Sequence, residues 1–138
     1  MKSISAVLLA TVLALGCVAV SLFGLNDHAV LTPPPEAVAE EFTRQIAAGR
    51  AELVRPLLSR AARERETTQV LRARTEPLRR AVGVLEQVSA VAGWVRDHQA
   101  AAHALLQGDT GTAVLSFTFV REQGRWTVDE WHRSPAGE

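Results

Sequence analysis

The chain has 138 residues, and its 15 basic and 15 acidic side chains leave a formal net charge of zero. This length suits one compact domain rather than two. Neutrality disfavours nucleic acid as a partner, since nucleic-acid-binding domains carry a basic excess. The single cysteine excludes an intrachain disulfide and a cysteine-based metal cluster. No glycine pattern of a nucleotide site occurs, so we expect neither a metal nor another cofactor.

The N-terminal part of the chain contains a long uncharged segment. From residue 4 to residue 25, 17 of 22 side chains are apolar. A helix of this length spans about 33 Å, enough to cross the hydrocarbon core of a bilayer. Lys2 precedes the segment and four acidic residues follow it before residue 42, which places the N-terminus in the cytoplasm. We expect a single-pass signal anchor over residues 1–25, in the inner or plasma membrane, with the remaining chain outside the cytoplasm.

Two other interpretations of this segment stay open. A cleaved secretory signal requires small residues at the cleavage site, and residues 26–29 match that requirement poorly. A lipoprotein signal is suggested by residues 14–17, which end in Cys17 and make it a candidate for lipidation. Ala14 stands where such signals usually have leucine, and mostly apolar residues follow Cys17 where a polar tether is expected.

A proline-rich linker and a helical region are expected next. Residues 26–35 end in three consecutive prolines, which favour a stiff extended spacer. Apolar residues at a spacing of four then predict a helix from Glu36 to Gly49. A short second helix is expected over residues 53–58. A third, from Arg60 to Arg80, should be broken or bent near its proline at position 77.

From residue 82 onward the pattern changes to that of strands. Valines become frequent and the spacing of apolar residues alternates, although the four alanines near residue 102 also permit a helix. Strands are expected at residues 84–95, 99–106, 114–121 and 125–132, with tight turns between the later ones. The sequence predicts an α+β domain over residues 36–133, with two to three helices packed on a curved antiparallel sheet of three to four strands, and a tail over residues 134–138.

The order of these elements resembles that of nuclear-transport-factor-2-like domains, in particular small bacterial members. The resemblance rests on the residues of the opening helices, at 35–42, 46–50 and 57–59, and on those of the final hairpin, at 108–110 and 121–128. It covers about residues 34 to 133. It implies a curved sheet wrapped around helices into a cone that holds a pocket. The family includes isomerases, dehydratases, ligand binders and membrane-anchored assembly factors, so the fold does not select a function.

The best-known enzymes of this family use an aspartate base with a tyrosine that stabilises the developing oxyanion. This chain contains no tyrosine, so we assign no catalytic residue. Aromatic side chains are nevertheless candidates to line the pocket, with packing in the core as the alternative. The pocket candidates are Phe42, Trp94, Phe117, Phe119, Trp126 and Trp131. Trp126 and Trp131 have opposite parity, so only one of them should face the inside of the sheet unless a bulge intervenes.

Two sets of polar residues are the remaining candidates for a functional site. Asp97, His98 and His132 form a general-base constellation if they meet across strands, and are ordinary surface residues if they do not. Ten arginines and four acids between residues 44 and 80 give a local charge of +6, which suits anionic lipid, an acidic partner or a solvated face. The basic surface candidates are Arg60, Arg63, Arg65, Arg72, Arg74, Arg79 and Arg80.

These observations predict a non-catalytic, membrane-anchored binding or assembly module outside the cytoplasm. Its partners would be the membrane and either an envelope protein or a small apolar ligand, with self-association left open. The alternatives are an isomerase-like or dehydratase-like enzyme that uses the cone pocket, and a lipoprotein or secreted form of the same domain.

Overall fold

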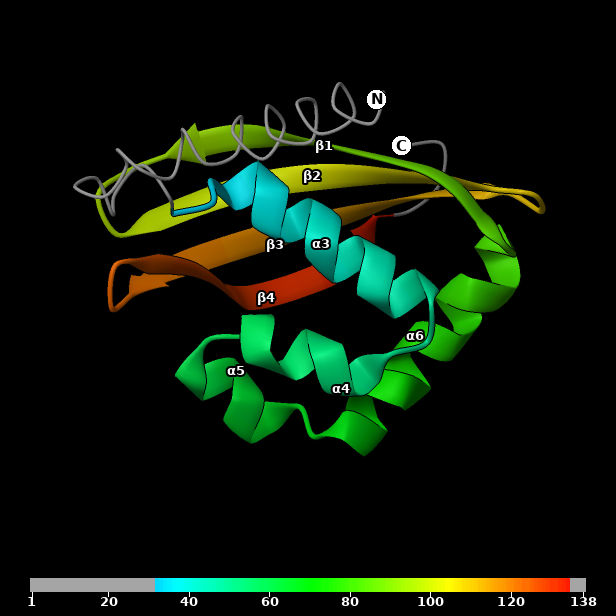
Figure 1. Cartoon of the computed structure of the whole chain (residues 1–138), viewed down its shortest axis with the longest axis horizontal. Coiled ribbons are helices and arrows are strands. Elements are labelled where there is room, and N and C mark those ends of the chain that lie inside the picture. The colour runs from blue at the N-terminus through cyan, green and yellow to red at the C-terminus, as the bar shows by residue number, and fades with distance from the viewer. Residues whose placement is uncertain (1–31, 135–138) are drawn as a thin grey trace, which may run out of the picture. The chain divides into compact units, whose positions relative to one another are not determined.

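The computed structural model describes residues 32–134 and confirms the expected α+β class. Four antiparallel strands lie in the order β1-β2-β3-β4, and the helices pack on one face of this sheet, here called the inner face (Figure 1). The helices are α3 (Pro35–Ala47), α4 (Ala51–Val54), the 3-10 turn η1 (Arg55–Leu57), α5 (Arg60–Arg65) and α6 (Thr68–Val82). The strands are β1 (Leu85–Val95), β2 (Gln99–Gly108), β3 (Thr112–Glu122) and β4 (Arg125–Ser134).

Helix α3 forms where the sequence predicts a helix. A proline occupies its first position, where the missing N–H costs no helical hydrogen bond. Val38, Phe42 and Ile46 share one face of the helix and are buried against the sheet. The helix ends before Gly49, whose φ of 76° is the left-handed conformation that glycine adopts readily.

The expected single helix from Arg60 to Arg80 is wrong, because the chain forms two helices, α5 and α6. The break lies at residues 66–67, and two hydroxyl side chains explain it. Ser59 Oγ accepts a hydrogen bond from Ala62 N at 3.1 Å, and Thr67 Oγ1 accepts one from Val70 N at 3.2 Å. Each caps the N-terminus of a new helix, as serine and threonine commonly do.

The expected break near Pro77 does not occur, and Pro77 lies inside α6. A proline removes the hydrogen bond to the carbonyl four residues earlier, here that of Ala73. Both residues are exposed, so water can satisfy the freed carbonyl. The proline is therefore tolerated on the solvent side of the helix.

A bulge in β4 places both of its tryptophans on the inner face. Phe119 pairs with Val128 and Thr118 pairs with Glu130, which leaves Asp129 without a partner in β3. The extra residue changes the alternation of side chains along the strand. Trp126 and Trp131 are consequently both buried, at 7% and 5% exposure, despite their opposite parity in the sequence.

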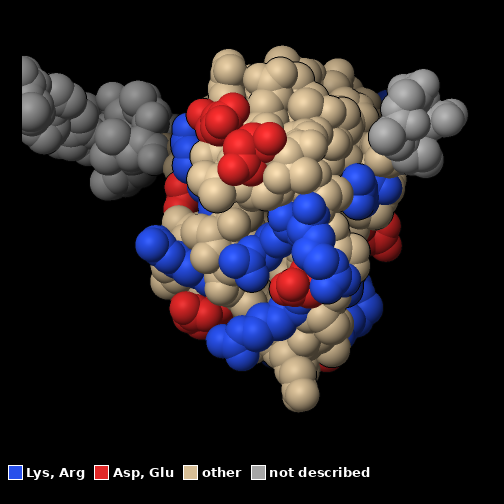
Figure 2. Space-filling view, turned by 90° about the vertical axis from the view of Figure 1, so that its right-hand side faces the viewer, with Lys and Arg blue, Asp and Glu red and all other residues tan. Residues whose placement is uncertain are grey.

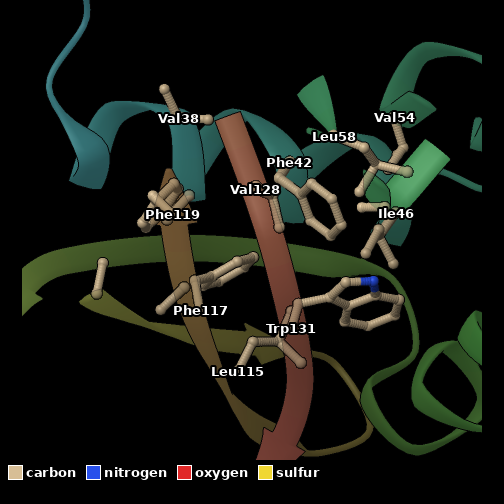
Figure 3. Packing of buried hydrophobic residues seen from close by; sticks show 14 of the residues in the cluster. Val38, Phe42, Ile46, Val54, Leu58, Leu115, Phe117, Phe119, Val128 and Trp131 are labelled. Atoms are coloured by element: carbon tan, nitrogen blue, oxygen red, sulfur yellow. The ribbon is translucent and has the colours of Figure 1, made fainter. Parts of the chain in front are cut away.

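Close-packed aromatic rings fill the space between the helices and the sheet (Figure 3). The ring centroids of Phe42 and Phe117 are 5.2 Å apart, and those of Phe42 and Trp131 are 5.3 Å apart, both in edge-to-face arrangements. Ile46, Leu58 and other aliphatic side chains surround these rings. The core thus joins α3 to the two C-terminal strands.

The predicted signal anchor and the lipidation candidate Cys17 lie outside the described residues. So do most of the linker and all but the first residue of the predicted tail. Within residues 32–134, no helix combines the length and the apolar character that crossing a bilayer requires.

Thr43 provides a test of the core. Its side chain is fully buried, and its Oγ1 has no hydrogen-bond partner among the described residues. We expect Thr43→Val to raise the free energy of unfolding by about 1 kcal/mol, because it removes a buried polar group that gains no compensating bond. Chemical denaturation of the full chain in detergent would measure the change.

Thr75 supplies the matched control for this substitution. It is also a buried helical threonine, but its Oγ1 donates a hydrogen bond to Arg72 O at 3.2 Å. Thr75→Val should therefore leave stability unchanged or lower it. Equal losses of stability in both variants would contradict this account of Thr43.

Candidate functional site

A partly buried ion pair lies where the α5–α6 junction meets strand β4. Glu66, only 6% exposed, follows α5 directly, and its Oε1 accepts hydrogen bonds from Arg74 Nη1 at 2.6 Å and Trp131 Nε1 at 3.3 Å. Arg74 also donates to Trp131 O at 2.8 Å, and its guanidinium carbon lies 3.9 Å from the centroid of the Trp131 ring. The α5–α6 region thus meets β4, more than 50 positions away in the sequence, at one carboxylate oxygen.

The geometry of this cluster is that of a structural clamp. Arg74 satisfies the charge of Glu66 and covers the indole face, an arrangement that combines an ion pair with a cation–π contact. Nothing in the sequence singles out Glu66, because it is one of four acids in an arginine-rich stretch. Arg74, a member of the predicted basic surface, has a side chain that is 37% exposed, and its guanidinium also lies over the Trp131 ring.

Three other arginines bind backbone carbonyls, two of them in the short helical segments and one in β4. Arg55 donates to Glu66 O at 3.2 Å and to Arg63 O at 2.9 Å. Arg63 donates to Leu58 O at 2.8 Å, and Arg65 donates to Asp129 O at 2.6 Å. Short helices leave most of their carbonyls without an internal partner, and these guanidinium groups supply donors for them.

The arginines of α6 beyond Arg74 are paired with carboxylates. Arg72 lies 3.5 Å from Glu52, and Arg79 and Arg80 each lie 3.7 Å from Glu76. Figure 2 shows this side of the molecule, where arginine atoms run in a band that has carboxylates beside and between them. These carboxylates are already counted in the net +6 of residues 44–80, and Arg79 and Arg80 share one of them, so the pairs hold individual arginines in place but leave the excess positive charge. Arg60 is the one member of the predicted basic surface whose side chain has no partner within residues 32–134.

The aromatic pocket candidates do not enclose a common cavity. Five of them are at most 7% exposed and belong to the core cluster: Phe42, Phe117, Phe119, Trp126 and Trp131. Trp94 is 43% exposed on strand β1. A bulge between Ala92 and Trp94 places the Trp94 side chain on the outer face of the sheet, where the residue pairs with Ala101. Trp94 and Phe119 border a hollow of about 300 Å³ together with Asp129 and Glu130.

The structure does not bring the predicted polar site together. Asp97 and His98 lie in the turn between β1 and β2 and border a hollow of about 480 Å³. The carbonyl oxygen of His98 accepts a hydrogen bond from Arg121 N, near the end of β3. His132 instead pairs with Ser116, which lies five residues before Arg121 in the same strand. Five residues of strand correspond to about 17 Å. No shared proton-transfer site results.

Strand pairing reveals a polar row that the sequence analysis missed. On the outer face, His103 Nδ1 lies 3.1 Å from Ser116 Oγ, which in turn lies 2.9 Å from Ser134 Oγ. His132 is the other cross-strand neighbour of Ser116. Among residues 32–134, no three histidine, cysteine or acidic side chains converge in a way that would hold a metal ion.

The fold is shared with a structurally characterised protein. A Campylobacter jejuni protein described as a nuclear-transport-factor-2-like transpeptidase matches with a TM-score of 0.57 at 15% identity, over 71% of this chain and 99% of that one. A calcium/calmodulin-dependent protein kinase II association domain from Xanthomonas campestris matches with a TM-score of 0.41 at 17% identity, over 74% of this chain and 85% of that one. No protein-family model and no curated protein sequence matches. The first match shows the nuclear-transport-factor-2-like fold, as the sequence resemblance implied.

The ion pair of Glu66 and Arg74 predicts a measurable coupling. We expect Arg74→Gln to lower the free energy of unfolding by about 1–3 kcal/mol, because it leaves the buried Glu66 carboxylate without its charged partner. Glu66→Gln should lower it less, because the Arg74 side chain is 37% exposed and water can solvate it. The double variant should lose less than the sum of the two. Denaturation of the four proteins of this cycle measures the coupling.

The exposed pair of Arg80 and Glu76 is the control for this cycle. Both side chains are more than half exposed and lie 3.7 Å apart, so their coupling should stay below about 1 kcal/mol. A coupling between Glu66 and Arg74 no larger than this one would show that the clamp contributes little to stability.

Proposed function

We propose that this nuclear-transport-factor-2-like domain is a non-catalytic binding or assembly module that engages a protein partner. Residues 4–25 would anchor it in the membrane, and residues 36–133 would lie outside the cytoplasm. The proposal for the anchor rests on the length and apolar character of that segment. The choice of a binding role over catalysis rests on the interior of the domain.

The single observation that carries this choice is the packed aromatic centre of the domain, since the hollow of about 620 Å³ at the C-terminal ends of α3 and α6 contains none of the aromatic pocket candidates. Enzyme and ligand sites are concave pockets with a few convergent polar groups. Here Phe42, Phe117 and Trp131 pack edge to face in the space between helices and sheet, and all three are at most 5% exposed. The guanidinium of Arg74 covers one face of the Trp131 ring, and Glu66 accepts a hydrogen bond from the indole N–H. An isomerase-like reaction would need space that these side chains occupy.

The outer face favours a protein over a small apolar ligand. Val91, Trp94 and Leu105 are 63%, 43% and 38% exposed, and the strand register places all three on that face. Strand β1 also lies at the edge of the sheet, so one side of its backbone is free of partner strands within the described domain. Exposed apolar side chains next to an open strand edge suit a protein surface.

The anchor can be tested by membrane fractionation. We expect the full chain to stay in the membrane pellet after washing with alkaline carbonate, and a variant lacking residues 4–25 to leave it. Cys17→Ser should behave like the full chain, because the proposed anchor is the helix and not an acyl group. Release of the full chain by carbonate, or of the Cys17→Ser variant alone, would contradict the anchor.

The partner surface can be tested by site-specific photocrosslinking in native membranes. A photoreactive amino acid at Trp94 or Val91 should form a discrete adduct with one protein, because these positions lie on the proposed contact face. The same group at Val84, which is 69% exposed but precedes the strand, provides the control. A domain without adducts at Trp94 and Val91, or with equal adducts at Val84, would contradict this proposal.

A further inference from the structure

A small hollow lies between α5 and the β3–β4 turn, away from the core. Its volume is about 310 Å³, near the lower limit for small-ligand pockets. The turn itself is a tight hairpin in which Gln123 and Gly124 have φ values of 53° and 76°. The polar residues that border the hollow are Arg60, Arg63, Glu122, Gln123, Arg125 and Thr127.

The positive charge of this hollow is not balanced. The side chains of Arg60 and Arg125 make no hydrogen bond or ion pair with any residue from 32 to 134. Arg63 uses Nη1 to bind Leu58 O, which leaves its other N–H groups available. By contrast, Arg72, Arg79 and Arg80 on α6 each have a carboxylate within 4 Å.

Glu122 is the one carboxylate that borders the hollow, and it already has a role. Its two carboxylate oxygens accept from the backbone N–H of Arg60 at 3.2 Å and 3.3 Å. Three guanidinium groups and this carboxylate leave the hollow with a net charge of +2. The hairpin holds Glu122 and Arg125 as a cross-strand pair, so the charges are held on a defined framework.

We propose that this hollow binds a phosphate-type dianion. A phosphate group carries a charge of about −1.5 to −2 near pH 7 and presents three acceptor oxygens, which matches a net +2 supplied by three guanidinium groups. Arginine also binds phosphate in a bidentate manner. A single carboxylate would neutralise only half of the charge. This site is separate from the proposed partner surface on β1 and β2 and does not depend on the anchor.

The test is titration of the full chain, in non-ionic detergent, with inorganic phosphate at constant ionic strength. Binding is followed by isothermal calorimetry and by NMR signals of the arginine side chains. We expect saturable binding that Arg60→Gln and Arg125→Gln each weaken about fivefold or more. Neither residue has a side-chain partner in the domain, so both variants should fold. Arg50→Gln, which removes an equally unpaired arginine away from the hollow, should leave the affinity unchanged.

Glu122→Gln should have the opposite effect on the affinity for phosphate. The amide can still accept from Arg60 N, but one negative charge leaves the hollow, so phosphate should bind about threefold more tightly or better. A surface that attracts anions only by overall charge would respond equally to Glu130→Gln, which removes a carboxylate from the outer face. An equal response of these two variants would therefore overturn the proposal.

A second ligand distinguishes the source of the phosphate. Short-chain phosphatidic acid presents the same group on a lipid, and short-chain phosphatidylcholine is its control. Equal affinity for inorganic phosphate and phosphatidic acid would assign a free phosphate group, and tighter binding of phosphatidic acid a lipid headgroup. No saturable binding of either, or binding that Arg60→Gln and Arg125→Gln leave unchanged, overturns the site.

Discussion

The bulge at Asp129 determines how the helices and the sheet of this domain fit together. It adds one residue to β4 between Val128 and Glu130, and thereby brings two tryptophans to the same face. It also directs Asp129 toward the helices, where its carboxylate accepts from Ser59 Oγ at 2.9 Å and its carbonyl from Arg65. Without the extra residue, one tryptophan would face solvent and α5 would lose both contacts.

The arginines of the same region make contacts that lysines could not reproduce. A guanidinium group carries five N–H donors in a planar fork and can stack on an aromatic ring. Arg55 and Arg63 use this geometry to satisfy carbonyls of short helical segments, and Arg65 binds the carbonyl of Asp129 in β4. Arg74 uses it to join Glu66 to Trp131. A lysine ammonium could replace the charge but not the pattern of bonds.

The family resemblance and the interior of the domain lead to different functional expectations. The fold is one in which a cone commonly holds a pocket, yet the corresponding space in this chain contains Phe42, Phe117 and Trp131 in mutual contact. The polar groups proposed for proton transfer lie apart, with His98 in the β1–β2 turn and His132 on the outer face of the edge strand β4, opposite Ser116.

Local pattern was sufficient for the class of the fold, the helix containing Phe42 and the four strands, because helical and strand periodicity depend on residues close in sequence. It gave a wrong prediction at residues 60–80. The helix was expected to break near Pro77, whereas the caps Ser59 and Thr67 begin two separate helices. Local pattern could not assign the partners of Glu66 or the faces of the two tryptophans in β4. Those depend on one unpaired residue in a strand and on contacts between residues more than 50 positions apart. Net charge in a sequence counts arginines, whereas tertiary packing determines which of them remain available to bind an anion.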